Sequence, residues 1–307
     1  MTHEIEGRLW AHLPDRLRQG LAALAGEHLE TLEELRVRAA RPVALYGHDW
    51  QAWLGPGGAV SHPGDALVLT RDEVELLVER LAERSLHGRE HELRAGYLSL
   101  PGGHRAGVAG RAVITEGQVT TSRDWVGVNL RLARAVPGAA RPLLERLDRE
   151  HGTHPAPSVL LLSAPRGGKT TMLRDLVCLL SQRGFRVGVI DERREIGNGG
   201  PPDGFDLGPH TDLMDGWPKS PGLEAAVRAL GLDVVATDEI GGADDARAIR
   251  QARRSGVSVL ATAHATGLEE AVRHPLLARM LADRVFDWVA ELDRSPKPGE
   301  LRRLRQL

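Results

Sequence analysis

The sequence predicts an α/β protein of two domains, with a phosphate-binding loop on a C-terminal parallel sheet and a smaller N-terminal α+β domain. Three observations lead to this fold class, and the first is that apolar runs alternate with helical patterns after residue 158. A glycine-rich turn joins the first of these runs to a helix. Before residue 136, helical periodicity gives way to short β-like segments separated by glycines. We therefore expect an N-terminal domain over 1–135, a helix and linker over 136–157, and the sheet domain over 158–307.

The N-terminal domain is predicted to be mainly helical around a short strand pair up to residue 95. Apolar residues recur at helical spacing over 17–35 and 74–86, and Thr70 with Glu73 resembles a capping start for the second stretch. The pattern then changes to β-like segments joined by glycine-rich turns, and we expect strands at 97–100, 106–115 and 126–132.

The C-terminal domain is predicted to alternate strands with helices. Strands are expected at 159–162, 186–190, 234–237, 257–261 and 284–290. Helices are expected at 141–149 before the linker, and then at 170–182, 223–229, 244–254 and 268–281. The glycine and proline density of 197–221 indicates a mobile, nucleotide-responsive loop, and the arginines of 253–254 and 302–305 indicate solvated surface.

Composition excludes several classes of protein. The 307 residues are 41% hydrophobic and 27% charged, as in soluble globular proteins. We expect a cytoplasmic protein without direct membrane insertion, because no apolar stretch approaches the roughly 20 residues of a membrane span and no signal peptide pattern begins the chain. The net charge of −2 makes nucleic acid an unlikely partner, and the single Cys178 rules out an internal disulfide framework.

The strongest motif is the glycine-rich turn after the apolar run 159–162. Its residues are Ser163, Ala164, Pro165, Arg166, Gly167, Gly168, Lys169, Thr170 and Thr171. This is a P-loop pattern, in which backbone amides close around phosphates, Lys169 reaches the β and γ phosphates and Thr170 binds Mg²⁺. Ser163 stands where the usual pattern has its first glycine. Lysine is otherwise rare, at positions 169, 219 and 297 beside 37 arginines, so a lysine here indicates a need for a compact point charge.

A pair of acids ends another predicted strand, over 234–237. Asp238 is predicted to hold Mg²⁺, and Glu239 to orient and deprotonate an attacking water. Adjacent strand residues point to opposite faces, so the two carboxylates can share a site only where the strand ends. The glycines at 241 and 242 permit that turn.

Two further strand ends supply polar residues to the same edge. Asp191 and Glu192 follow one strand and His264 follows another, where open α/β sheets bind ligands. The imidazole of His264 is suited to sensing a γ-phosphate. A site of this kind also needs a positive charge from outside the P-loop core, for which we consider Arg131 and Arg134, and after them Arg193.

Taken together, these motifs resemble the stage III sporulation protein AA family, a branch of the type II/type IV secretion ATPases with a RecA-like P-loop core. The resemblance runs nearly end to end. It rests on 34–38, 96–97, 101–111, 129–134, the P-loop, 190–193, 211–216, 237–241 and 261–264. The sequence departs from the family pattern at Ser163, at His210, where we expect Arg, and at Trp217, where Cys is usual.

The resemblance implies a cytoplasmic ATPase that forms a homo-oligomer, a hexameric ring, and powers or gates a membrane-embedded export or channel apparatus. An integral-membrane component would be its partner and would hold it at the cytoplasmic membrane. By the same analogy Lys169, Thr170, Asp238 and Glu239 bind and hydrolyse MgATP, and Asp191, Glu192 and His264 match the family's acidic and histidine motifs. Arg131 and Arg134 would carry the arginine role.

Two alternative functions use the same core. One is a nucleic-acid motor, which the net charge and the 4% aromatic content disfavour because few rings are available to stack on bases. The other is a nucleotide-gated assembly scaffold with little turnover, which Ser163 favours and an intact Glu239 disfavours.

Overall fold

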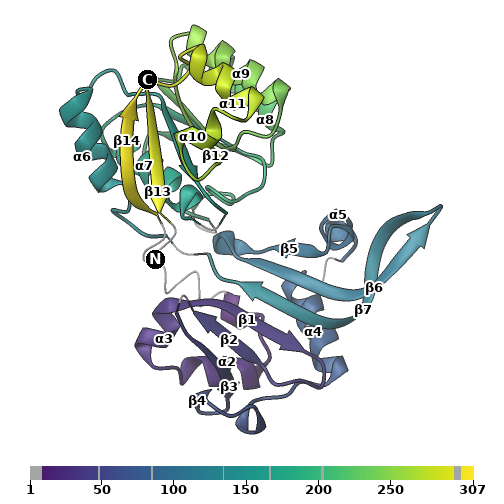
Figure 1. Cartoon of the computed structure of the whole chain (residues 1–307). Coiled ribbons are helices and arrows are strands. Elements are labelled where there is room, and N and C mark those ends of the chain that lie inside the picture. Colours follow the sequence, from purple (N-terminus) through teal and green to yellow (C-terminus); the bar gives the residue numbers. More distant parts are fainter. Residues whose placement is uncertain are drawn as a thin grey trace. The chain divides into compact units, whose positions relative to one another are not determined.

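The computed structural model divides the chain into two units, Met1–Arg134 and Ala135–Leu307 (Figure 1). It describes residues 9–47, 49–83, 86–133, 135–165, 167–201, 204–293 and 299–307. Each unit is built on its own seven-stranded sheet. The sheet of the first unit is antiparallel, whereas that of the second unit is almost wholly parallel.

The N-terminal sheet has the strand order β4-β3-β2-β1-β7-β6-β5. Its strands are β1 Leu32–Arg38, β2 Ala44–Gly47, β3 Gln51–Gly55, β4 Gly58–Val60, β5 Tyr97–Ser99, β6 Arg105–Thr115 and β7 Gln118–Arg131. The helices of this unit are α2 Asp15–Ala22, α3 Gly26–Thr31, α4 Arg71–Leu81 and α5 Glu90–Arg94. The hairpin of β6 and β7 turns at Glu116 and Gly117, which both have positive φ. The strand expected over 126–132 is longer than predicted, because β7 begins at Gln118.

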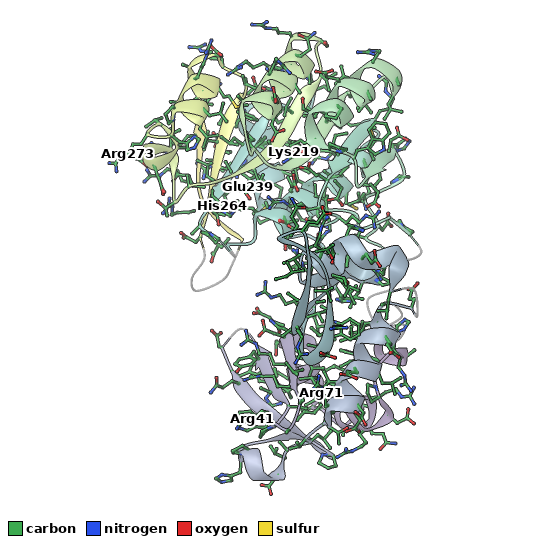
Figure 2. All side chains as sticks on the ribbon, turned by 90° about the vertical axis from the view of Figure 1, so that its right-hand side faces the viewer. Arg41, Arg71, Lys219, Glu239, His264 and Arg273 are labelled. Carbon is green, nitrogen blue, oxygen red and sulfur yellow. The ribbon has the colours of Figure 1, made fainter. Side chains whose placement is uncertain are left out.

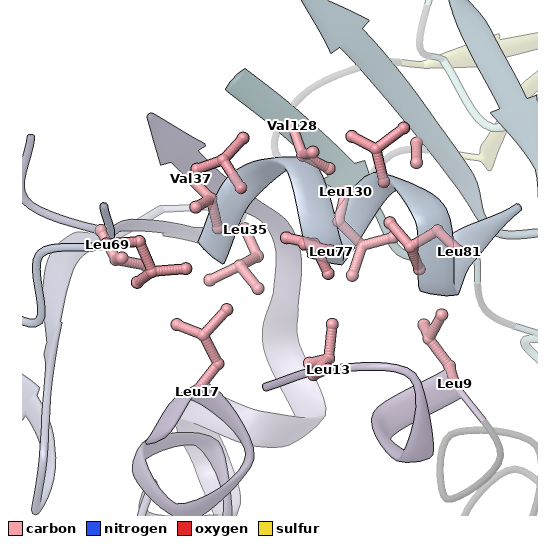
Figure 3. Close-up of a cluster of buried hydrophobic side chains, with 14 of the residues drawn as sticks. Leu9, Leu13, Leu17, Leu35, Val37, Leu69, Leu77, Leu81, Val128 and Leu130 are labelled. Carbon is pink, nitrogen blue, oxygen red and sulfur yellow. The ribbon is translucent and has the colours of Figure 1, made fainter. Parts of the chain in front are cut away.

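The core of this unit lies between its helices and one face of the sheet. Leucines 9, 13 and 17 from the first helical segments meet Leu77 and Leu81 of α4 beneath the apolar residues of β1 and β7 (Figure 3). Helix α4 begins with a capping box, because the hydroxyl of Thr70 accepts from the Glu73 amide at 3.2 Å and the Glu73 carboxylate accepts from the Thr70 amide at 2.8 Å. The start predicted for this helix is confirmed.

The helix predicted over 17–35 is wrong in its last part. Residues 32–38 form β1, which lies between β2 and β7 and alternates buried Leu35 and Val37 with more exposed neighbours. Pairing on both sides overrides the helical spacing of the leucines. The short strand pair expected before residue 95 is also wrong in size. The structure has four strands there, β1 to β4, which pair with one another in the sheet.

The C-terminal sheet has the order β10-β9-β11-β12-β8-β13-β14, with only β14 antiparallel to its neighbour. Its strands are β8 Val159–Ser163, β9 Val187–Asp191, β10 Thr211–Asp215, β11 Val234–Glu239, β12 Ser258–His264, β13 Trp288–Asp293 and β14 Glu300–Gln306. The helices are α6 Arg141–Glu150, α7 Lys169–Gln182, α8 Lys219–Ala229, α9 Ala243–Arg254, α10 Leu268–Ala271 and α11 Pro275–Ala282. Helices α8, α9 and α11 cover one face and α6 and α7 the other (Figure 1). Right-handed crossovers account for the faces of α7, α8, α9 and α11, which connect parallel strands.

Two expectations for this unit are corrected and a third is extended. The predicted loop 197–221 contains β10, which pairs in parallel with β9. The arginine-rich tail is exposed at Arg302 and Arg303, as expected, but it forms the edge strand β14, where Arg302 and Arg305 lie 3.0 and 3.3 Å from the buried carboxylate of Glu291. The helix predicted over 268–281 is two helices, because Pro275 lacks the amide that would continue the first one.

Replacing Thr70 by Ala should destabilise the N-terminal unit by about 1 kcal/mol, because the Glu73 amide loses its hydrogen-bond acceptor. Urea unfolding followed by tryptophan fluorescence measures this change. Thr70→Ser keeps the hydroxyl and should stay close to the wild-type stability; equal losses in the two variants would contradict a capping role.

Candidate active site

The candidate site lies at the carboxyl edge of the C-terminal sheet. Strands β8, β12, β11 and β9 are parallel neighbours, so their last residues meet at one edge. His264, at the end of β12, pairs in register with Ser163 at the end of β8. Figure 2 shows Lys219, Glu239 and His264 close to one another in this unit.

The P-loop connects β8 to α7, with its last glycine in a left-handed conformation. Gly168 has φ 80° and precedes Lys169, the first residue of α7, so the helix N-terminus faces the loop. Ser163 is buried and its hydroxyl donates to the carbonyl of Ala164 at 2.8 Å. A Cβ added at Gly167 would lie 1.7 Å from the Ser163 oxygen, so only glycine fits beside this serine. Pro165 is exposed, Thr170 and Thr171 are half-buried, and Arg166 lies outside the described residues.

Lys169 is turned into its own loop. Its ammonium donates to the carbonyls of Ser163 at 2.9 Å and Ala164 at 3.1 Å, and lies 2.9 Å from Nδ1 of His264. The residue is 7% exposed. Burial lowers the pKa of this lysine, and the negative charge of Glu239 opposes part of that change.

His264 links the P-loop lysine to the candidate general base. Its Nε2 lies 3.1 Å from the Glu239 carboxylate, while its Nδ1 faces Lys169. The same Glu239 oxygen lies 3.7 Å from the guanidinium of Arg193. The structure therefore brings together Lys169, His264 and Glu239, and adds Arg193 to them.

Asp238 occupies an irregularity in β11. Thr237 pairs with Ala261 and Glu239 pairs with the next residue of β12, so Asp238 is an extra residue in its strand. This bulge interrupts the alternation that would send adjacent carboxylates to opposite faces. Asp238 is 5% exposed, and burial raises the pKa of its carboxyl while the nearby Lys219 opposes that rise.

The side chains present suit a magnesium ion that binds together with phosphates. Within the part of the chain that the structure describes, Oδ2 of Asp238 has no partner and Oδ1 faces the Lys219 ammonium at 2.7 Å. A carboxylate with a threonine hydroxyl is an oxygen donor set that Mg²⁺ accepts. Among the described residues, no group of three or more His, Cys, Asp or Glu is placed to hold a metal ion. Mg²⁺ at nucleotide sites commonly takes its other ligands from phosphates and water.

Sequence reasoning gave no role to Lys219, which the structure places beside the acid pair. Its ammonium lies 2.7 Å from Asp238 and donates to the backbone carbonyl of Glu239. The residue is 4% exposed. The available signal was composition, because this is one of only three lysines in an arginine-rich chain.

Asp191 organises a loop. Its buried carboxylate accepts from the backbone amides of residues 195, 196, 197 and 198, at distances between 2.7 and 3.2 Å. Arg174 of α7 holds the same loop, donating to the carbonyls of Glu195 and Ile196 with its guanidinium 3.4 Å from the centre of the Phe205 ring. Burial lowers the pKa of Arg174 to about 10.

Glu192 and Arg131 are the remaining candidates that the structure describes. Glu192 is half-exposed, with its carboxylate 3.9 Å from Lys219. Arg131 belongs to β7 of the N-terminal unit, where it lies 3.6 Å from Glu34. Arg134 lies outside the described residues.

The family follows from comparison with known proteins. A family model described as sporulation stage III, protein AA, matches residues 7–306. The chain belongs to the stage III sporulation protein AA family. The member from Bacillus subtilis (strain 168), stage III sporulation protein AA, is 34% identical over 295 residues, which are 94% of this chain and 91% of that protein.

The chain is also similar to a protein of Porphyra purpurea. The uncharacterized protein ycf45 of Porphyra purpurea is 29% identical over 212 residues, 66% of this chain. The match covers 36% of ycf45, so the chain corresponds to about a third of that relative.

Solved structures confirm the fold class, a RecA-like P-loop core with a smaller α+β domain. The ATPase DotB of Legionella pneumophila has a TM-score of 0.58 at 15% identity, covering 91% of this chain and 77% of DotB. The pilus retraction motor PilT with bound ADP has a TM-score of 0.57 at 16% identity, covering 86% and 75%. Over the described residues, no helix has the length and apolar character of a membrane span.

Replacing Gly167 by Ala should weaken nucleotide binding about tenfold or more, because overpacking against Ser163 costs ~1–3 kcal/mol and distorts the loop. Adding Ser163→Gly removes the atom that the new Cβ meets, so the double variant should recover much of this loss. Binding of a fluorescent ATP analogue measures both. Gly64→Ala, where a Cβ meets nothing, is the matched control; losses that simply add in the double variant would contradict the contact.

Proposed function

We propose that this protein is an Mg²⁺-dependent ATPase. The observation that carries the proposal is the unbroken series of contacts from Lys169 through His264 to Glu239, at the sheet edge where Asp238 also lies. A phosphate-binding lysine, a histidine and a candidate base within contact distance are the parts that nucleotide hydrolysis needs.

Each group has a chemical task in this proposal. The amides of the P-loop and the ammonium of Lys169 hold the phosphates, and Thr170 and Asp238 provide ligands to Mg²⁺. When bound, Mg²⁺ neutralises part of the phosphate charge. Glu239 accepts the proton of the attacking water, and His264 holds the orientation of Glu239.

Lys169 has partners within the protein, and this bears on nucleotide binding. Its ammonium contacts two loop carbonyls and His264. A phosphate oxygen would have to replace some of these contacts, so nucleotide binding would also free His264 from the lysine. We propose that this exchange reports phosphate occupancy to Glu239.

The assembly and the partner form a further part of the proposal. We propose a hexameric ring in which Arg131 and Arg134 of one protomer complete the site of its neighbour, at the base of a membrane-embedded export or channel apparatus. The sporulation protein of B. subtilis and the fold shared with DotB and PilT support this role. Contact with an integral-membrane component would hold the protein at the cytoplasmic membrane.

The division of labour predicts different defects in two variants. Lys169→Ala should abolish nucleotide binding, because the phosphates lose their point charge. Glu239→Gln should keep binding and lose roughly two to four orders of magnitude in turnover, the usual size of a general-base effect. The measurements are binding of a fluorescent ATP analogue and steady-state ATP hydrolysis across a range of protein concentrations.

The outcomes separate the alternatives. Specific activity that rises with protein concentration and disappears in Glu239→Gln supports an oligomeric ATPase with shared sites. Bound ATP without turnover at any concentration indicates a nucleotide-gated scaffold, and ATP-dependent retention of single-stranded DNA on filters indicates a nucleic-acid motor. Glu269→Gln, which alters an exposed carboxylate paired with Arg305, is the control and should hydrolyse ATP normally.

A further inference from the structure

Lys219 is a buried cation that the proposed mechanism does not use. It is the first residue of α8 and is 4% exposed. Its ammonium lies 2.7 Å from Oδ1 of Asp238 and donates to the backbone carbonyl of Glu239. One side chain therefore contacts both members of the acid pair.

Two more carboxylates lie near the Lys219 ammonium, at distances longer than that of a close ion pair. Glu192 and Asp245 are 3.9 and 3.8 Å from the same ammonium. Asp245 also accepts from the amide of Gly241 at 2.9 Å, in the turn that follows the acid pair. Three negative groups thus surround one positive group, which gives the ammonium more than one favourable position.

Helix α8, which carries Lys219, packs closely against the sheet. A Cβ added at Gly222, one turn into α8, would lie 2.7 Å from Ile190 of β9. This close approach fixes the base of the lysine side chain relative to the sheet. Any change in the position of the ammonium must then come from the flexible side chain.

A cation beside Asp238 competes with any second cation that uses the same carboxylate. A unit positive charge a few ångström from a divalent ion opposes its binding, most strongly where water is excluded. Asp238 is 5% exposed, so water screens this interaction little. The carboxylate can bind Mg²⁺ fully only if the ammonium moves away.

We propose that Lys219 is a positioning residue whose ammonium occupies the cation position beside Asp238 and shifts toward Glu192 and Asp245 when MgATP binds. It thereby sets the Mg²⁺ requirement of the site and holds the Glu239 peptide in place. This inference rests on the proposed function, because it assumes that Asp238 binds Mg²⁺. A purely structural ion pair would stabilise the protein without affecting the Mg²⁺ requirement.

The test is a titration of Mg²⁺ at fixed protein and fluorescent ATP analogue, read by anisotropy. In Lys219→Met the half-saturating Mg²⁺ concentration should fall about tenfold, since a competing unit charge is removed. Lys219→Arg keeps the charge and should stay near the wild-type requirement. Arg253→Met, which removes one positive charge paired with Asp287 outside the site, is the matched control and should leave the requirement unchanged.

Thermal unfolding of single and double variants, measured without nucleotide or Mg²⁺, tests the ion pair between Lys219 and Asp238. Lys219→Met should lower the melting temperature, because Asp238 is left buried without its cation, and adding Asp238→Asn should restore part of the loss. If Lys219→Met alone does not fold, the double variant can still be measured, because it removes both charges of the pair. Failure of the double variant to fold, or losses that add, would overturn the inference.

The two proposals fail in different ways. A wild-type protein without Mg²⁺-dependent nucleotide binding would defeat the proposed function and this inference together. Normal binding in the wild type with an unchanged or raised Mg²⁺ requirement in Lys219→Met would overturn only the role of Lys219.

Discussion

Charge buried at the edge of the C-terminal sheet has to be neutralised, and this constraint governs the arrangement of the site. Lys169, Lys219, Asp191 and Asp238 are each less than a tenth exposed. An isolated buried charge costs several kcal/mol, so each of these groups requires partners within the protein. Loop carbonyls and His264 surround Lys169, backbone amides surround Asp191, and the remaining two charges face each other.

The parallel sheet makes these partners available. Strands β8, β9, β11 and β12 end side by side, so residues far apart in the chain arrive at one edge. The bulge at Asp238 then lets one strand present two acids to the same region, one toward Lys219 and one toward His264. A regular strand would have directed one of them to the opposite face.

The parts of the site that could be predicted from the sequence are contiguous motifs. The P-loop and the acid pair each carry their chemistry within a few residues, and the apolar runs of the core predict strands because both faces are buried. The last of these strands, expected over 284–290, lies at Trp288–Asp293. Lys219 has no such motif, since its role depends on where α8 begins against β9. The edge strand β14 was missed for a related reason: its arginines resemble solvated surface until the buried Glu291 is seen beside them.

In the N-terminal unit the missed elements also depend on tertiary pairing. The spacing of Leu32 and Leu35 alone fits a helix. These residues form β1 because the chain pairs there with β2 on one side and β7 on the other. The capping box before α4 was predictable because it is local: both partners lie within four residues. Hydrogen bonds between residues close in the chain can be predicted from a sequence, whereas the neighbours of a strand in a sheet cannot.

The segment after β9 is rich in glycine and proline, yet side chains from outside it hold its first residues. Its glycines and prolines predicted a mobile loop. The carboxylate of Asp191 accepts from the backbone amides of residues 195–198, and Arg174 of α7 donates to the carbonyls of residues 195 and 196. Moving residues 195–198 away from α7 would break these bonds and expose a buried carboxylate and a buried guanidinium. These contacts join residues 195–198 to α7, the helix that follows the P-loop. A response to nucleotide is easier to place at Lys219, whose long side chain can change partners while its backbone stays seated on the sheet.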